Sequence, residues 1–127
     1  MRNPILATLA LAACVGAAAA SAATQKDDEM LKLASASGCI ACHGVEAGRP
    51  GPGGMAPVGP AWLDVSKKYK GQKDALANLT RTVMQGSSPY QSHWKGQVSG
   101  LAMPPNAVAI SEVDARKLVG WILALQK

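Results

Sequence analysis

The sequence predicts an all-α fold of about four helices in one domain. Apolar residues recur at helical spacing in several stretches, and glycine, proline or capping residues mark the ends of these stretches. No run of alternating apolar and polar residues is long enough to form a sheet. The 127 residues suit a single domain once an N-terminal export segment is set aside.

The helices are expected over residues 27–37, 62–69 and 74–85, followed by a last helix that Ser111 caps. The first carries acidic residues at its start and Gly38 at its end, which suits the helix dipole and a glycine stop. The third ends at Gly86. In the last helix, Ser111-Glu112-Val113-Asp114 fits a capping box. Its apolar face contains Leu118, Trp121, Ile122 and Leu125.

Between the first two helices lies Cys39-Ile40-Ala41-Cys42-His43, a C-x-x-C-H pentapeptide that is typical of covalent c-type haem attachment. Two thiols three positions apart can each form a thioether bond with a vinyl group on the same porphyrin edge. The adjacent His43 imidazole is then able to bind the iron. The motif therefore predicts one covalent haem c, with His43 as an axial ligand.

Three other interpretations of the two cysteines fit less well. A thioredoxin-like dithiol belongs beside a βαβ pattern, and no strand-rich stretch flanks Cys39. A structural zinc site needs further ligands at finger-like spacing, and His93 lies fifty positions downstream. A disulfide between Cys39 and Cys42 would be strained and would leave His43 unexplained.

Residues 1–23 are predicted to be a cleaved signal peptide, and residues 24–127 the mature domain. Arg2 precedes an apolar run over residues 5–20, which is short of a transmembrane span, and small residues follow it. We therefore expect no transmembrane segment in the mature chain. Anchoring as a lipoprotein through Cys14 stays open, because residues 11–14 resemble a lipoprotein signal. Since the apolar run continues past Cys14, we favour cleavage after Ala22 or Ala23.

The mature chain is only mildly basic. The sequence has 13 basic and 8 acidic residues, and loss of Arg2 lowers the formal net charge from +5 to +4. So small a charge argues against a nucleic-acid partner. It suits weak docking onto an acidic patch of a redox partner protein. We expect a monomer without a small-molecule substrate.

Two long stretches are expected to form loops around the haem. Residues 48–60 hold five glycines and four prolines, a composition that would also suit a disordered linker. Residues 86–106 contain His93, Trp94 and Met103. Loops of this length in a compact domain are usually functional.

The second axial ligand is expected among Met30, Met55, Met84, Met103 and His93. Two of the methionines lie in predicted amphipathic helices, where core packing is the default. Met55 has only a short tether to His43. Met103 precedes two prolines that stiffen its loop, and the sixty residues between it and His43 allow the chain to reach the opposite haem face. Met103 is therefore the predicted sulfur ligand, and His93 is expected at the surface.

Over nearly all of residues 28–127, the chain resembles the small single-haem cytochromes c of bacterial respiratory chains. The motifs are Gly38-Cys-Ile-Ala-Cys-His43, Val58-Gly-Pro-Ala-Trp62, Gln85-Gly-Ser87, Met103-Pro-Pro-Asn-Ala-Val108 and the C-terminal segment 120–127. The resemblance implies a helical fold wrapped around haem, with His and Met as axial ligands. It also implies export-side haem attachment, and hence a periplasmic location.

Carried over by motif, the resemblance implies that Met103 is the distal ligand. It implies that the Pro60 carbonyl accepts a hydrogen bond from the His43 ring and so fixes the tautomer. Asn106 would lie near the Met sulfur or a haem propionate. The Trp94 indole would reach a propionate, although a merely buried loop Trp is the alternative. Both long loops exceed those of the smallest family members.

These observations predict a soluble periplasmic electron-transfer protein, not an enzyme, with a six-coordinate c-type haem. Two protein ligands leave no open site for substrate, and a Met sulfur favours the reduced iron. One alternative is a cytochrome subunit bound permanently to a periplasmic dehydrogenase or oxidase, with the longer loops as its docking surface. The other is a haem enzyme or gas sensor with an open sixth site, which Met103 argues against.

Overall fold

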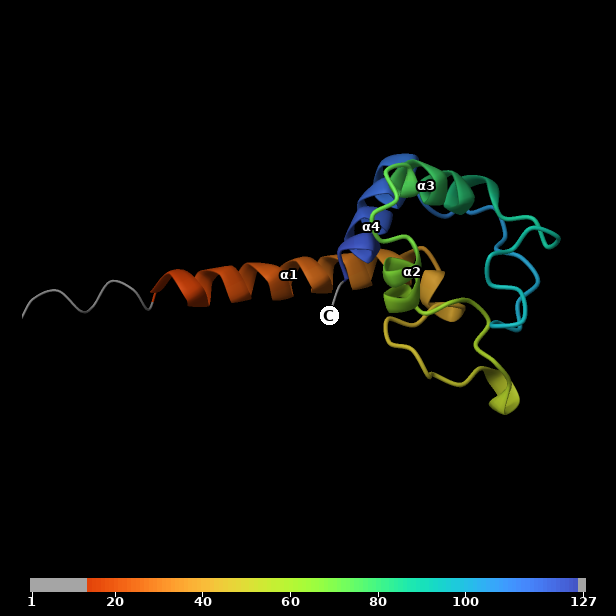
Figure 1. Cartoon of the computed structure of the whole chain (residues 1–127). Helices are drawn as coiled ribbons and strands as arrows, with labels where there is room; N and C mark the ends of the chain where they lie inside the picture. Colours follow the sequence, from red (N-terminus) through yellow and green to blue (C-terminus); the bar gives the residue numbers. More distant parts are fainter. Residues whose placement is uncertain (1–13, 126–127) are drawn as a thin grey trace, which may run out of the picture.

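Four α-helices make up the fold in the computed structural model, which describes residues 14–125 (Figure 1). They are α1 (Cys14–Ala36), α2 (Trp62–Lys68), α3 (Ala75–Gln85) and α4 (Glu112–Ala124). Two short 3₁₀ turns cover Cys39–Ala41 and Pro52–Gly54. The described residues form no strand beyond an isolated bridge between Lys95 and Val98. The predicted all-α class is confirmed.

Helix α1 is longer than predicted. Its C-terminal part matches the helix expected over residues 27–37, but α1 is already helical at Cys14, the first residue that the structure describes. The reason is that the Ala-rich stretch before Thr24 has high helix propensity. The N-terminal part of α1 projects away from the other helices (Figure 1). Of the predicted signal peptide, residues 1–13 lie outside the described residues, and residues 14–23 lie in α1.

Helix α4 is central to the packing, because it contacts α1, α2 and α3. Of its predicted apolar face, Leu118, Trp121 and Ile122 are buried and Leu125 packs against the same core. Trp62 of α2 meets the Trp121 ring nearly edge-on, with ring centroids 5.7 Å apart and an interplanar angle of 80°. The Trp121 indole N–H donates to the Asp27 carboxylate at 2.7 Å, which joins α4 to α1.

The predicted glycine stop of α3 and the predicted serine cap at the start of α4 are confirmed. Gly86 ends α3 with a positive φ of 81°. Ser111 caps α4, because its Oγ accepts a hydrogen bond from the Asp114 amide at 3.1 Å. The second half of the capping box differs from the prediction: the Ser111 hydroxyl donates to the Asp114 carboxylate at 2.9 Å.

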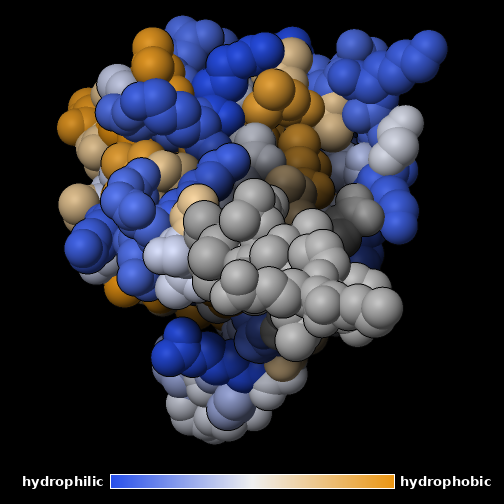
Figure 2. All heavy atoms as spheres, turned by 90° about the vertical axis from the view of Figure 1, so that its left-hand side faces the viewer, coloured by the Kyte–Doolittle hydropathy of each residue, from blue (hydrophilic) through white to orange (hydrophobic). Residues whose placement is uncertain are grey.

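The surface combines polar and apolar areas. Figure 2 shows the side toward which α1 projects, where hydrophilic side chains dominate and smaller hydrophobic areas lie between them. Some exposed large hydrophobic residues lie in the two long loops, namely Met55, Tyr90 and Leu101. Within residues 14–125, no helix has both the length and the apolar character needed to cross a bilayer.

Candidate functional site

The two motif cysteines lie in a tight turn directly after α1. Gly38 adopts a left-handed conformation with φ 75°, which glycine reaches at no steric cost, and the 3₁₀ turn follows. The amides of Cys42 and His43 both donate to the Cys39 carbonyl, at 3.3 and 3.0 Å. Both thiols are free, and burial raises the pKa of the Cys39 thiol. The turn therefore presents two unpaired thiols and an imidazole on one short segment.

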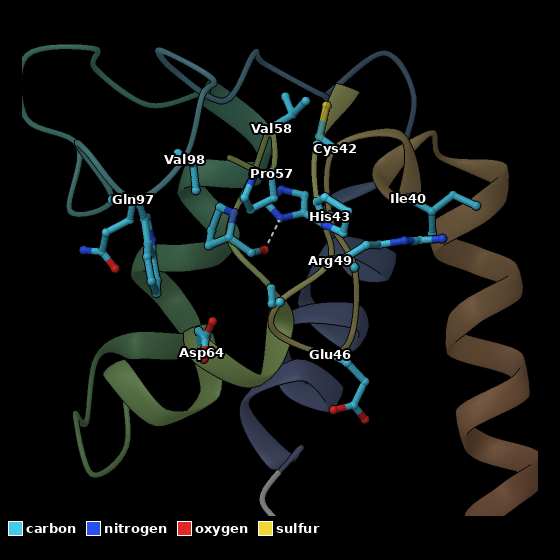
Figure 3. A pocket seen from close by; sticks show the side chains of 18 of the residues that line it. Ile40, Cys42, His43, Glu46, Arg49, Pro57, Val58, Asp64, Gln97 and Val98 are labelled. Atoms are coloured by element: carbon cyan, nitrogen blue, oxygen red, sulfur yellow. Dashed lines mark hydrogen bonds between the residues drawn. The ribbon is translucent and has the colours of Figure 1, made fainter. Parts of the chain in front are cut away.

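The His43 ring is oriented from two directions. Its Nδ1 donates to the Pro60 carbonyl at 2.8 Å, the dashed line in Figure 3. The ring also stacks on Trp62, with centroids 6.0 Å apart and an interplanar angle of 20°. Burial lowers the pKa of His43, although the Pro60 hydrogen bond acts in the opposite direction. The neutral ring with its proton on Nδ1 has its lone pair on Nε2, which is the form that binds a metal.

Gly59 allows the loop that carries Pro60 to lie directly against this ring. A Cβ at position 59 would fall 2.7 Å from His43 Cε1 and 2.9 Å from Nδ1, closer than real Cβ contacts. The Gly59 amide also donates to the Cys42 carbonyl at 2.8 Å. Any side chain at this position would displace either the loop or the imidazole.

A cavity of about 410 Å³ opens beside His43 (Figure 3). Residues 57–60 of the first long loop form part of its wall, and Trp94, Gln97 and Val98 of the second long loop form another. In Figure 3, Gln97 and Val98 lie on the side of His43 away from Ile40. Both long loops therefore meet around the C-x-x-C-H segment.

Met103 is fixed by the residues that follow α3. Its amide donates to Ser87 Oγ at 2.8 Å, and its carbonyl accepts from the Ser87 amide at 2.9 Å. Gly86 permits this approach, because a Cβ there would lie 2.9 Å from the Met103 carbonyl oxygen. The Met103 backbone is thus held at both of its polar groups.

Asn106 fastens the end of the same loop to α3. Its backbone amide and its side-chain amide both donate to the Val83 carbonyl, at 3.0 and 3.3 Å. The side chain also donates to the Pro104 carbonyl at 2.6 Å. These contacts are with backbone groups, so a role of Asn106 beside sulfur or a propionate stays a prediction.

Trp94 is half-buried at the cavity wall, and α2 holds its segment in place. The Lys68 ammonium lies 4.6 Å from the centroid of the Trp94 ring and donates to the His93 carbonyl at 2.8 Å. The Tyr69 hydroxyl is hydrogen bonded to His93 Nδ1 at 2.7 Å. His93 is exposed, as its sequence position suggested. A contact of Trp94 with a propionate stays a prediction.

The cavity brings together only part of the predicted site. Cys42, His43, Pro60 and Trp94 line it, whereas Cys39, Met103 and Asn106 are not among its lining residues. Met30 and Met84 pack against the hydrophobic core, which is the packing expected for both. Met55 is 59% exposed.

Two residues that hold the candidate ligands had no role in the sequence-based prediction. Gly59 stands directly before Pro60, and Ser87 directly follows the glycine that ends α3. A signal for Ser87 was present, because hydroxyl side chains near helix ends often bond to neighbouring backbone groups. For Gly59 the signal was its position next to Pro60, whose carbonyl was expected to accept a hydrogen bond from the His43 ring.

Comparison with known proteins relates this chain to one family. Residues 31–126 match the family described as Cytochrome c. The chain is 44% identical over 95 residues to cytochrome c-551 of Allochromatium vinosum, an alignment that covers 75% of this chain and 84% of that protein. It is 36% identical over 95 residues to cytochrome c-552 of Hydrogenobacter thermophilus, covering 75% and 80% of the two chains. The crystal structure of Nitrosomonas europaea cytochrome c552 matches with a TM-score of 0.57 and 38% identity, over 76% of this chain and 99% of that one.

Proposed function

This chain belongs to the cytochrome c family, whose haem c is covalently attached, and we propose that it is a periplasmic carrier of single electrons. In this proposal Cys39 and Cys42 hold the haem through thioether bonds, and His43 and Met103 are the axial ligands. The haem iron, when bound, supplies the Fe(III)/Fe(II) couple. The protein residues fix the ligands, exclude substrate from the iron and offer a docking surface.

The observation that carries the proposal is the hydrogen bond from His43 Nδ1 to the Pro60 carbonyl at 2.8 Å. A ligating histidine typically donates its other ring N–H to a carbonyl or a carboxylate, which fixes the tautomer and strengthens the ligand. Free thiols on the same short segment supply the second requirement, because each thioether consumes one thiol. The residues present therefore fit a covalent haem.

The fixed backbone of Met103 supports its role as the second ligand. The two hydrogen bonds with Ser87 fix both backbone polar groups of this residue, and we infer that they would hold it in the same place in both oxidation states of the iron. A ligand that does not move between oxidation states keeps the reorganisation small, so electron transfer is fast. A Met sulfur also favours the reduced iron and raises the reduction potential.

A partner with an acidic surface is proposed from the distribution of lysines. The last turn of α2 and the residues after it carry exposed lysines at positions 67, 68, 70 and 73. Lys68 contacts the ring of Trp94, which lines the cavity. This positive surface would therefore attract an acidic partner to the edge of the haem site, in encounters that salt weakens.

The periplasmic location rests on the predicted signal peptide. Cleavage after Ala22 or Ala23 would leave Asp27, Asp28 and Glu29 in the first two turns of the shortened α1. Negative side chains near a helix N-terminus stabilise the helix, because they interact favourably with its dipole. The mature chain would then begin with a favourably charged helix.

The proposal is tested by visible spectra of the oxidised and reduced holoprotein. A bond between a Met sulfur and Fe(III) gives a weak red absorption band, which we expect in the wild type and not in Met103→Ala. Met55→Ala is the matched control, because Met55 lies exposed in the first long loop. A wild-type protein without the band, or a Met103→Ala variant that keeps it, would show that the axial assignment is wrong.

A further inference from the structure

The two long loops are directly joined by backbone hydrogen bonds. The Ser99 amide donates to the Pro57 carbonyl at 2.9 Å, and the Gly100 amide donates to the Val58 carbonyl at 3.0 Å. The Ser99 hydroxyl adds a longer contact with the Pro57 carbonyl at 3.4 Å. We call these two residue pairs the loop junction.

The loop junction connects the chain segments that contact or carry the two proposed axial ligands. On one side, Val58 is followed by Gly59 and Pro60, which contact the His43 ring. On the other side, Gly100 lies three residues before Met103. The junction therefore links the backbone that orients His43 to the backbone that presents Met103.

Gly100 is needed for the closeness of this contact. A Cβ at position 100 would lie 2.5 Å from the Val58 carbonyl oxygen and 3.4 Å from Val58 Cγ1. The glycines with positive φ in residues 14–125 do not include Gly100. A side chain is therefore excluded by the neighbouring backbone and not by the conformation of Gly100 itself.

We propose that the loop junction positions the Met103 loop relative to the His43 loop and so sets the strength of the sulfur–iron bond. Gly100 is a positioning residue, because it acts through Met103. The inference rests on the proposed function, in which His43 and Met103 are the axial pair. A loosened junction weakens the bond to sulfur before the helices unfold. It also lowers the reduction potential, since the sulfur favours Fe(II).

Gly100→Ala in the holoprotein tests this inference through two thermal transitions. The loss of the red band of Fe(III) reports the sulfur bond, and far-ultraviolet circular dichroism reports the helices. We expect the band to disappear at a lower temperature than the helix signal, together with a lower reduction potential. Equal temperatures for the two transitions and an unchanged potential would overturn the proposal.

Gly96→Ala is the matched control in the same loop. Gly96 has φ 79°, and nothing lies within 4 Å of a Cβ built there, so the substitution strains the backbone without pressing on another segment. We expect its band and helix transitions to coincide. A Gly96→Ala variant that separates them as Gly100→Ala does would refute a specific role of the junction.

A second measurement does not depend on the folding of any variant. In the reduced wild-type holoprotein, we expect the amides of Ser99 and Gly100 to exchange with solvent about as slowly as the Ser87 amide. Exchange at the rate of an unstructured peptide would contradict the junction. If the wild type lacks the red band or Met103→Ala retains it, the axial assignment is wrong. If both proteins behave as expected but Gly100→Ala changes neither the order of the two transitions nor the potential, only the proposed role of the junction is overturned.

Discussion

The Ser87 amide donates to the Met103 carbonyl at 2.9 Å, and the Ser87 hydroxyl oxygen accepts from the Met103 amide at 2.8 Å. The two bonds fix the carbonyl and the amide of a single residue. Ser87 in turn follows Gly86, whose positive φ ends α3 and brings the chain against the Met103 carbonyl. The end of one helix therefore sets the position of the proposed sulfur ligand.

Ser87→Ala is expected to weaken the sulfur–iron bond. The substitution leaves the Met103 amide without its acceptor, which costs about 1 kcal/mol. We expect the red band of the oxidised protein to disappear at a lower temperature than in wild type. Ser88→Ala is the control, because Ser88 Oγ accepts only from the nearby Tyr90 amide in residues 14–125. Equal effects of the two substitutions would show that the contact with Met103 is unimportant.

Gly59→Ala is expected to disturb the opposite ligand. The added methyl group would lie 2.7 Å from His43 Cε1, so the ring or the loop has to shift and the Pro60 hydrogen bond is lost or lengthened. We expect a lower yield of haem-containing protein and a changed reduction potential. Gly48→Ala provides the comparison, because Gly48 has a positive φ but open space around it. A Gly59→Ala protein with wild-type yield and potential would contradict this role for Gly59.

The parts of the fold that follow a helical period or a local motif were predictable. Glycine stops and the Ser111 cap marked the ends of α3 and α4, and the C-x-x-C-H turn marked the candidate haem site. The N-terminal bound of α1 differs from the predicted one, because charge placement suggested residue 27 while the alanine-rich stretch before it is also helical over the described residues from Cys14 on. The prediction rested on the charge pattern and set residues 1–23 aside as a signal peptide, so it did not use the helix propensity of their alanines.

The backbone contacts between and within the two long loops had no comparable signal. The hydrogen bonds of Ser99 with Pro57 and of Ser87 with Met103 join backbone groups of irregular segments. Such pairing has no period of 2 or 3.6 residues, and most amino-acid types can provide a backbone amide. The glycines needed for close approach were visible in the sequence, but the partner of each glycine was not.

The bond between Trp121 and Asp27 is expected to stabilise the attachment of α1. The Trp121 indole N–H donates to the Asp27 carboxylate at 2.7 Å, and the ring itself is buried against Trp62. Asp27→Ala removes the acceptor and leaves the indole N–H unpaired, so we expect a loss of about 1 kcal/mol in the free energy of unfolding. Denaturant titration of the holoprotein measures this loss. The neighbouring Asp28→Ala should change it far less, and a similar loss in both variants would point to charge alone.

The cap of α4 is expected to depend on pH through Asp114. The hydrogen bond from Lys117 is the largest cause that lowers the pKa of Asp114, followed by the bond from Ser111. A carboxyl whose pKa is lowered by folding stabilises the protein above its unfolded pKa of about 4, and this contribution is lost as the pH falls through the folded pKa. Asp114→Asn should therefore be less stable than wild type at pH 7, and the difference should shrink in acid.

Denaturant titrations at pH 7 and near pH 3 measure this change in the stability gap. Glu112→Gln is the control, because Glu112 is an exposed carboxylate in the same first turn of α4. It shares the interaction with the helix dipole but lies outside the contacts of Asp114 with Ser111 and Lys117. The loss of unfolding free energy caused by Asp114→Asn should thus be larger at pH 7 than the loss caused by Glu112→Gln. It should also shrink more as the pH falls. Equal gaps would assign the effect to the dipole and not to the cap.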